Sequence, residues 1–117
     1  MLRAWRATVN SWNGLAFAIR SEQAIREELA ALILSVPLAW LIGTTPARRV
    51  EMVAVILLLL VVELLNTAIE KLADRLTTDR DPQIGRVKDM GSAAVGVTLI
   101  IAGVVWLFAL AEWLGWV

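Results

Sequence analysis

The chain has 117 residues, a hydrophobic content of 59%, a mean hydropathy of +0.72 and a formal net charge of +0. This apolar share exceeds the roughly one half that is typical of soluble domains, which indicates that a lipid bilayer surrounds the protein. The balanced charge argues against a nucleic-acid partner, and the lack of cysteine and histidine excludes disulfides, thiolate nucleophiles, zinc sites and imidazole bases.

The first predicted element is an amphipathic helix over residues 1–20 that lies on the membrane surface. Four apolar residues fall within roughly 80° of arc at about 3.6 residues per turn, namely Leu2, Trp5, Val9 and Trp12. Tryptophan side chains anchor such helices among lipid headgroups. Gly14 is expected to end or bend the helix.

A first membrane-spanning helix is predicted over residues 22–42. Ser21 has the side chain of an N-cap, and Glu22 places an acid in the first turn. The uncharged stretch Leu29 to Ile42 is shorter than the ~20 residues that a bilayer needs, so neighbouring helices must support it or charged residues must lie partly at membrane depth. Gly43 to Pro46 then form a tight turn.

Second and third spans are predicted over residues 50–72 and 92–116, with a polar connector over 73–91. No internal repeat or second domain appears, so residues 1–117 form a single membrane domain. One stripe of the third span carries small residues, which let membrane helices approach closely: Ser92, Gly96 and Gly103.

Lysine and arginine residues are concentrated on one side of these spans. Four lie before or at the start of the first span and five lie in or beside the connector, against only Arg48 and Arg49 in the opposite loop. Cytoplasmic loops carry such an excess of positive charge. The N-terminus and the connector are therefore expected to face the cytoplasm, and the C-terminus, with Trp113 and Trp116, to face outward.

The acids of the second span share one helical face. Glu63, Glu70 and Asp74 fall within roughly 40° of one another, with Asn66 about 60° to the side. An acid at the middle of a span costs about 2.5 to 3.5 kcal/mol on insertion scales, so Glu63 is expected to face protein or trapped water. Desolvation there suits a general base that works near neutral pH. The alternative is that Glu63 and Asn66 are polar contacts between helices with no chemical role.

Two further polar groups lie at the predicted cytoplasmic boundary. Glu22, Glu70 and Asp74 could serve Mg²⁺, which takes oxygen ligands from one or two carboxylates plus substrate phosphates, or they could be solvated charges at helix ends. The segment from Gly85 to Ser92 places Lys88 at the expected entry to the third span, where a helix N-terminus favours phosphate. The alternative for that segment is a capped helix start with cytoplasmic positive charge.

Two strings closely resemble segments of the prokaryotic diacylglycerol kinase family: Glu63-Leu-Leu-Asn66-Thr-Ala-Ile-Glu70 with Asp74-Arg75, and Lys88-Asp89-Met90-Gly91-Ser92-Ala93-Ala94. The N-terminal layout is also similar: Arg3 and Arg6 on the surface helix, Ser11-Trp12-x-Gly14-Leu15, and Glu22 with Arg26 and Glu28. The resemblance covers essentially the whole chain.

This resemblance implies an all-α homotrimer in the bacterial inner membrane, which transfers phosphate from ATP, with Mg²⁺, to diacylglycerol at sites shared between chains. It implies that Glu63 is the catalytic base and that Glu22 and Glu70 bind the metal. The implied ATP contacts are Arg3, Asn10, Glu22, Glu70, Lys88 and Asp89. The implied lipid contacts are Arg3, Trp12, Glu28, Arg49, Glu63, Asn66, Ser92 and Trp106.

Two alternatives to a diacylglycerol kinase remain open. An undecaprenol kinase of the same family would share the architecture and differ in its lipid acceptor. A small non-enzymatic membrane protein, such as an assembly factor or a proton relay using Glu63 and Glu70, would consume no ATP with any lipid alcohol.

Overall fold

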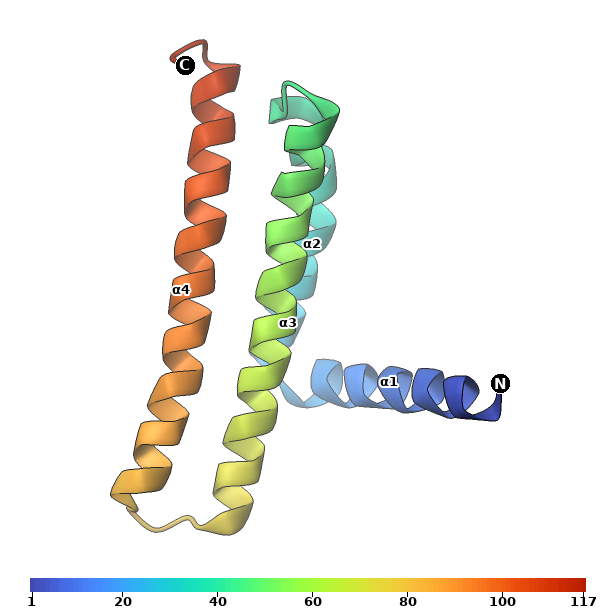
Figure 1. Cartoon of the computed structure of the whole chain (residues 1–117), viewed down its shortest axis with the longest axis vertical. Coiled ribbons are helices and arrows are strands. Elements are labelled where there is room, and N and C mark those ends of the chain that lie inside the picture. Colours follow the sequence, from blue (N-terminus) through green and yellow to red (C-terminus); the bar gives the residue numbers. More distant parts are fainter.

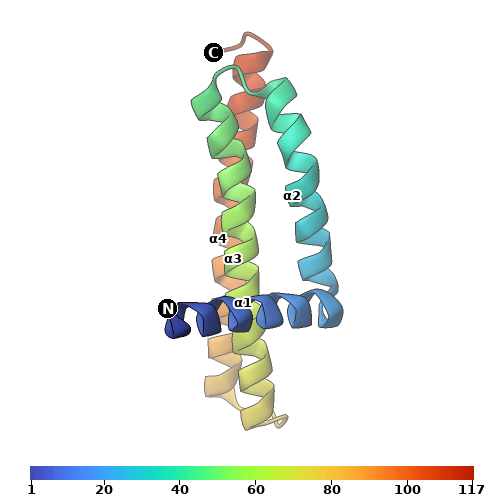
Figure 2. The same ribbon diagram turned by 90° about the vertical axis from the view of Figure 1, so that its right-hand side faces the viewer.

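The computed structural model describes residues 1–117 and is all-α, as the sequence predicts. Its helices are α1 (Leu2–Ser21), α2 (Gln23–Ile42), α3 (Pro46–Leu76) and α4 (Pro82–Trp113). Figure 1 shows α3 and α4 side by side, α2 behind α3, and α1 projecting sideways from them. In Figures 1 and 2, α3 and α4 extend beyond the level of α1 to the loop that joins them. We call the end of the molecule with the α3–α4 loop the loop end. The opposite end, with the α2–α3 turn and the C-terminus, is called the turn end.

α1 is a continuous helix, so the prediction that Gly14 ends it is wrong. A single glycine destabilises a helix by about 1 kcal/mol relative to alanine, and the helix-forming residues around Gly14 compensate for this loss. The C-terminus of α1 is capped from α2, because Nη1 of Arg26 donates to the carbonyl oxygens of Ile19 at 2.7 Å and Arg20 at 3.2 Å. The predicted apolar stripe of α1 stays exposed at every position: Leu2, Trp5, Val9 and Trp12.

One residue, Glu22, separates α1 from α2. Its backbone is extended, with φ −125° and ψ 119°, and its N–H donates to the carbonyl of Ala18 at 2.9 Å. The prediction that Ser21 caps α2 is wrong, because Ser21 is the last residue of α1 and Glu22 occupies the cap position. The side chain of Glu22 makes no capping hydrogen bond and is free for other contacts.

Two helices, α3 with 31 residues and α4 with 32, are long and apolar enough to cross a membrane by length and composition. The 20-residue α2, which the sequence predicts to span as well, does not pass that test. The physical reason is the cluster Arg26, Glu27 and Glu28 near its start, which leaves a short uncharged remainder.

The predicted tight turn between α2 and α3 is confirmed. Oγ1 of Thr45 accepts a hydrogen bond from the N–H of Arg48 at 3.1 Å, and Pro46 begins α3, where a backbone N–H is not needed. Gly43 lies against the side chain of Arg49 and the carbonyl of Ala39, where any Cβ would collide. The turn therefore requires glycine at this position.

The loop end is formed by residues 77–81, so α3 and α4 both continue well into the predicted connector. Oδ1 of Asp81 caps α4 by accepting from the N–H groups of Gln83 at 2.9 Å and Ile84 at 3.3 Å. Pro82 follows at the first helical position.

The interior of a single chain is small. Only 15 of 117 residues are buried, and six of these form two small hydrophobic clusters beside α3. One group is Ala18, Ile25 and Leu60, and the other is Ala39, Met52 and Ala109. Large apolar side chains of all three long helices remain exposed, so other molecules must cover them.

Candidate functional site

Four carboxylates gather where the start of α2 meets α3. Glu28 lies within electrostatic range of Glu63, and Glu63 lies within range of both Glu70 and Glu22. All four side chains are half-buried. The structure therefore brings together the predicted base, the two predicted metal acids and one predicted lipid contact.

The position of α1 gives the depth of this cluster along α3. Ser11, Gly14 and Leu15 of α1 line a hollow of about 300 Å³ together with Thr67 and other residues of α3. Glu63 precedes Thr67 by one helical turn, which is about 6 Å along the axis toward the turn end. Glu63 thus lies between the level of α1 and the turn end, and Glu70 lies near the level of α1 itself.

Asn66 orients one acid of the cluster. Its Nδ2 donates to Oε1 of Glu70 at 3.2 Å, while its buried Oδ1 has no hydrogen-bond partner. The Oδ1 atom packs against Gly91 of α4, where an added Cβ would collide with it. Asn66 is therefore both a contact between helices and a support for Glu70.

Glu28 carries a second unpaired acceptor. Its Oε2 atom is buried and has no hydrogen-bond partner in the chain. Leaving a buried acceptor unsatisfied costs about 1–3 kcal/mol, so such an atom marks a place where a hydroxyl or a water would be bound favourably.

Glu22 already binds a cation of the protein. Its Oε1 lies 2.8 Å from Nζ of Lys71, and the same ammonium sits 5.1 Å from the centre of the Phe17 ring. The charge pattern of the sequence places Lys71 only among the five positive charges in or beside the predicted connector. Its pairing with Glu22 could not be read from the sequence, because the two residues belong to different helical segments.

The chemistry of these donors fits Mg²⁺ that arrives with a nucleotide. Glu22 and Glu70 supply carboxylate oxygens, and Mg²⁺ commonly takes one or two carboxylates and completes its shell with phosphates and water. No group of three or more carboxylates is close enough to hold a metal alone. The pairing of Glu22 with an ammonium shows that its carboxylate attracts a cation at this place.

Lys88 lies on the part of α4 that extends beyond α1. It donates to Oδ1 of Asp74 at 2.6 Å, and this hydrogen bond raises the pKa of Lys88 above its ordinary value. The predicted phosphate seat at a helix N-terminus is wrong here, because α4 starts at Pro82 and the segment 85–92 lies within the helix. Two other predicted contacts on this segment are exposed: Asp89 and Ser92.

A polar hollow that the sequence does not predict lies at the loop end. It measures about 610 Å³ and no hydrophobic residue lines it. A smaller hollow of about 200 Å³ connects the loop to the Asp74–Lys88 pair. The local sequence signal is the alternating charge of Asp79, Arg80 and Asp81.

Three predicted contacts lie on α1, where they are exposed: Arg3, Asn10 and Trp12. The N-terminal half of α1, which carries Arg3, points away from the bundle (Figure 1).

Two other predicted lipid contacts lie near the turn end, distant from Glu63. Arg49 donates from Nε to the carbonyl of Gly43 at 3.0 Å and stacks on Trp40 at 4.3 Å from the ring centre. Trp106 donates from Nε1 to the carbonyl of Met52 at 3.0 Å. These side chains hold the turn end together, and a single chain does not bring them to the carboxylate cluster.

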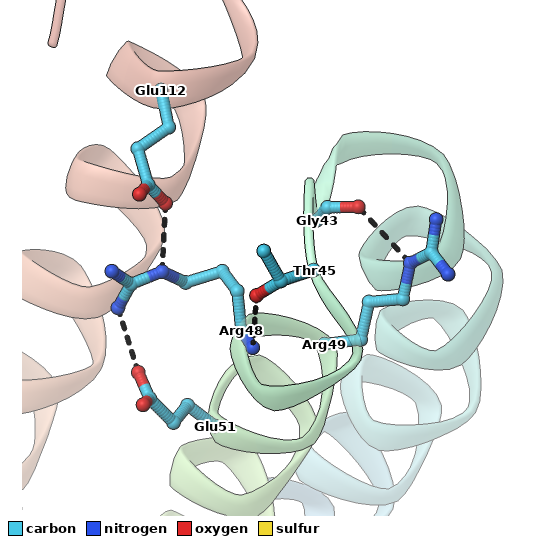
Figure 3. A network of polar contacts seen from close by, with 6 residues as sticks. All are labelled: Gly43, Thr45, Arg48, Arg49, Glu51 and Glu112. Atoms are coloured by element: carbon cyan, nitrogen blue, oxygen red, sulfur yellow. Dashed lines mark hydrogen bonds and ion pairs between the residues drawn. The ribbon is translucent and has the colours of Figure 1, made fainter.

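Figure 3 shows the polar network at the turn end. Arg48 donates from Nε to Oε1 of Glu112 at 2.8 Å and from Nη1 to Oε2 of Glu51 at 2.7 Å. Its guanidinium also lies 4.8 Å from the centre of the Phe108 ring. The network joins the start of α3 to the end of α4 and uses none of the predicted catalytic residues.

The sequence profile of the prokaryotic diacylglycerol kinase family matches residues 9–110 of the chain. The chain belongs to this family. The diacylglycerol kinase of Pseudomonas aeruginosa is 41% identical over 104 residues, which cover 89% of this chain and 85% of that protein. The diacylglycerol kinase of Haemophilus influenzae is 39% identical over 100 residues, covering 86% and 85%. That of Escherichia coli K12 is 38% identical over 108 residues, covering 92% and 88%.

Membership of the diacylglycerol kinase family makes the chain an enzyme of a lipid kinase family. The match includes the whole carboxylate cluster, the Asn66–Gly91 contact and the Lys88 segment. Arg3 lies before the first matched residue.

Proposed function

We propose that the chain phosphorylates 1,2-diacylglycerol to phosphatidic acid with ATP as the phosphate donor. The observation that carries this proposal is the gathering of Glu22, Glu28, Glu63 and Glu70 in a member of the diacylglycerol kinase family. The three relatives described above are all named diacylglycerol kinases, which favours this acceptor over undecaprenol.

The proposed enzyme crosses the bacterial inner membrane three times. Residues 1–20 form the surface segment, 22–42, 50–72 and 92–116 the spans, and 73–91 the cytoplasmic connector. The distribution of lysine and arginine supports a cytoplasmic N-terminus and a periplasmic C-terminus. The charged start of α2 is compatible with a span if neighbouring helices shield it.

We further propose a homotrimer with sites shared between chains. One chain buries few of its residues and leaves large apolar side chains exposed along α2, α3 and α4. The exposed positions of Arg3, Asn10 and Trp12 on α1 suit contact with a neighbouring protomer's site. The mass of the detergent-solubilised protein after chemical cross-linking tests this assembly, and a monomer would contradict it.

In the proposed mechanism, Glu63 accepts the proton of the lipid's primary hydroxyl while that oxygen attacks the γ-phosphorus in line and ADP leaves. Glu22 and Glu70 would hold Mg²⁺, which supplies neutralisation of the phosphate charge when bound. Asn66 keeps the Glu70 carboxylate in place through its hydrogen bond. Lys88 of α4 would bind the phosphates of ATP through its ammonium group.

The experiment that tests the function supplies purified protein with radiolabelled ATP and either diacylglycerol or undecaprenol in parallel mixed micelles. Label in phosphatidic acid is the expected result. Label only in undecaprenyl phosphate would reassign the acceptor. The absence of label from both lipids would contradict a lipid kinase and favour the non-enzymatic alternative.

Glu63→Gln removes the proposed base while keeping the size of the side chain. We expect turnover to fall by about 10²–10⁴-fold, the range typical of general base catalysis. The matched control is Glu51→Gln, which neutralises an acid at the turn end of the same helix. Near-normal turnover of the Glu63 variant would show that the residue is only a polar contact.

A further inference from the structure

The junction between α1 and α2, which we call the hinge, consists of one residue. Glu22 is the only residue between the two helices, and its backbone is extended. Arg26 caps the end of α1 from the α2 side. The direction of α1 therefore depends on contacts made at or near this residue.

A single side chain of α3 makes a polar contact with this hinge. Lys71 pairs with Glu22 at 2.8 Å and lies 5.1 Å from the ring centre of Phe17, in the last turns of α1. No other ion pair or side-chain hydrogen bond joins α3 to α1 or to the hinge. Lys71 also lines the hollow between α1 and α3.

We propose that Lys71 is a positioning residue that acts as a cationic latch. In the metal-free chain its ammonium holds the Glu22 carboxylate and fastens α1 to α3, and Glu22 exchanges this partner for a divalent cation when a metal nucleotide binds. The proposal rests on the proposed function, in which Glu22 is a metal ligand.

The geometry suits a contact that opens and closes. The Lys71 and Glu22 side chains are 42% and 32% exposed, so water competes for both and the pair is weak. The pair also leaves Glu22 neutralised while no metal is bound, next to Glu63 and Glu70. After exchange, the cation–π contact with Phe17 keeps the ammonium beside the end of α1.

Metal affinity provides the first test. Binding of Mn²⁺ in the presence of a non-hydrolysable ATP analogue is measured by electron paramagnetic resonance on the full-length protein. Lys71→Met removes the competing ammonium, so half-saturation is expected at a Mn²⁺ concentration that is about two- to fivefold lower. This fold-change corresponds to the free energy of an exposed ion pair. Lys71→Arg keeps the competitor and should bind like the unmodified chain.

The matched control is Arg75→Gln, which removes an exposed cation one turn along α3 that forms no ion pair. An equal shift in this control would mean that the effect is one of overall charge, and it would overturn the latch. Unchanged or weaker Mn²⁺ binding in Lys71→Met would overturn it as well.

The mobility of the hinge provides a second test that needs no metal. Amide hydrogen exchange of residues 17–25 in the metal-free protein is expected to be faster in Lys71→Met than in Lys71→Arg or Arg75→Gln. Equal exchange in all three variants would overturn the fastening of α1.

These readouts separate the latch from the proposed function. If no lipid is phosphorylated while the metal and exchange effects appear, the function fails and the latch stands. If diacylglycerol is phosphorylated while neither effect appears, only the latch fails.

Discussion

At the scale of single residues, the packing of α3 against α4 at Asn66 depends on Gly91. The sequence pointed to the stripe of Ser92, Gly96 and Gly103, yet Ser92 is exposed and a Cβ added at either glycine would meet open space within the chain. The neighbouring Gly91 is the residue that is buried, against Oδ1 of Asn66. Helical periodicity identified a surface of α4 with small residues. The packing of the two helices decides which α4 residue faces α3.

Gly91→Ala should destabilise the protein, because the new methyl group collides with Asn66. We expect a loss of about 1–3 kcal/mol, the usual cost of overpacking, measured by denaturation in detergent followed by circular dichroism. Gly85→Ala is the control, since nothing lies within 4 Å of the added Cβ. Equal free energies of unfolding for both variants would contradict a tight contact between Gly91 and Asn66.

At the scale of helices, α3 and α4 are joined by ion pairs at both ends and by small residues between them. Lys88 and Asp74 pair at the loop end, and Arg48 and Glu112 pair at the turn end. Between these ends α4 contributes buried positions of low volume: Gly91, Thr98 and Ala102. Between Asp89 and Glu112 α4 carries no charged residue, as a membrane-spanning helix requires, whereas α3 is interrupted by Glu63.

Asp74→Asn tests the pair at the loop end through its pH dependence. The hydrogen bond to Asp74 raises the pKa of Lys88, so the pair stabilises the folded chain fully below the ordinary lysine pKa of about 10.4 and loses its effect as the pH rises through the folded pKa. The variant should therefore melt at a lower temperature at about pH 8, and the difference should disappear at strongly alkaline pH. Asp79→Asn, which neutralises an unpaired acid in the loop, should melt normally. A difference that is equal at both pH values would contradict the assignment to Lys88.

At the scale of the whole molecule, one chain is an open frame. Its extents are 53 × 41 × 23 Å, and few of its residues are buried. α1 projects away from α2, α3 and α4 (Figure 1). Such a frame is stable only where lipid or further chains cover its apolar faces. A substrate site made by one chain would stay open to the side, which supports the proposal that protomers share their sites.

The proposed orientation can be tested with single cysteines, because the natural chain contains none. A membrane-impermeant maleimide should label Thr44→Cys, at the α2–α3 turn, in intact cells. It should label Asp79→Cys, at the loop end, only after the membrane is permeabilised. The reverse pattern would invert the topology and place the carboxylate cluster on the side without ATP.

Patterns among near neighbours were sufficient to predict the all-α class, the turn at Gly43 to Pro46, the acidic face of α3 and the family. These features depend on helical periodicity, on turn chemistry and on short sequence strings, all of which are local. Local patterns failed at the helix ends near Gly14, Ser21 and Lys88, because several residues in each region can serve as a cap or a break and distant contacts choose among them.

Contacts between segments far apart in the chain were decided by the tertiary structure alone. The pairing of Lys71 with Glu22, the packing of Asn66 on Gly91 and the distance of Arg49 and Trp106 from Glu63 are of this kind. A helical pattern states which side chains share a face but not what lies opposite that face, because the angle and register between helices come from packing. The sequence therefore predicts which residues could carry the chemistry. The partners of each charged group are known only from the tertiary structure.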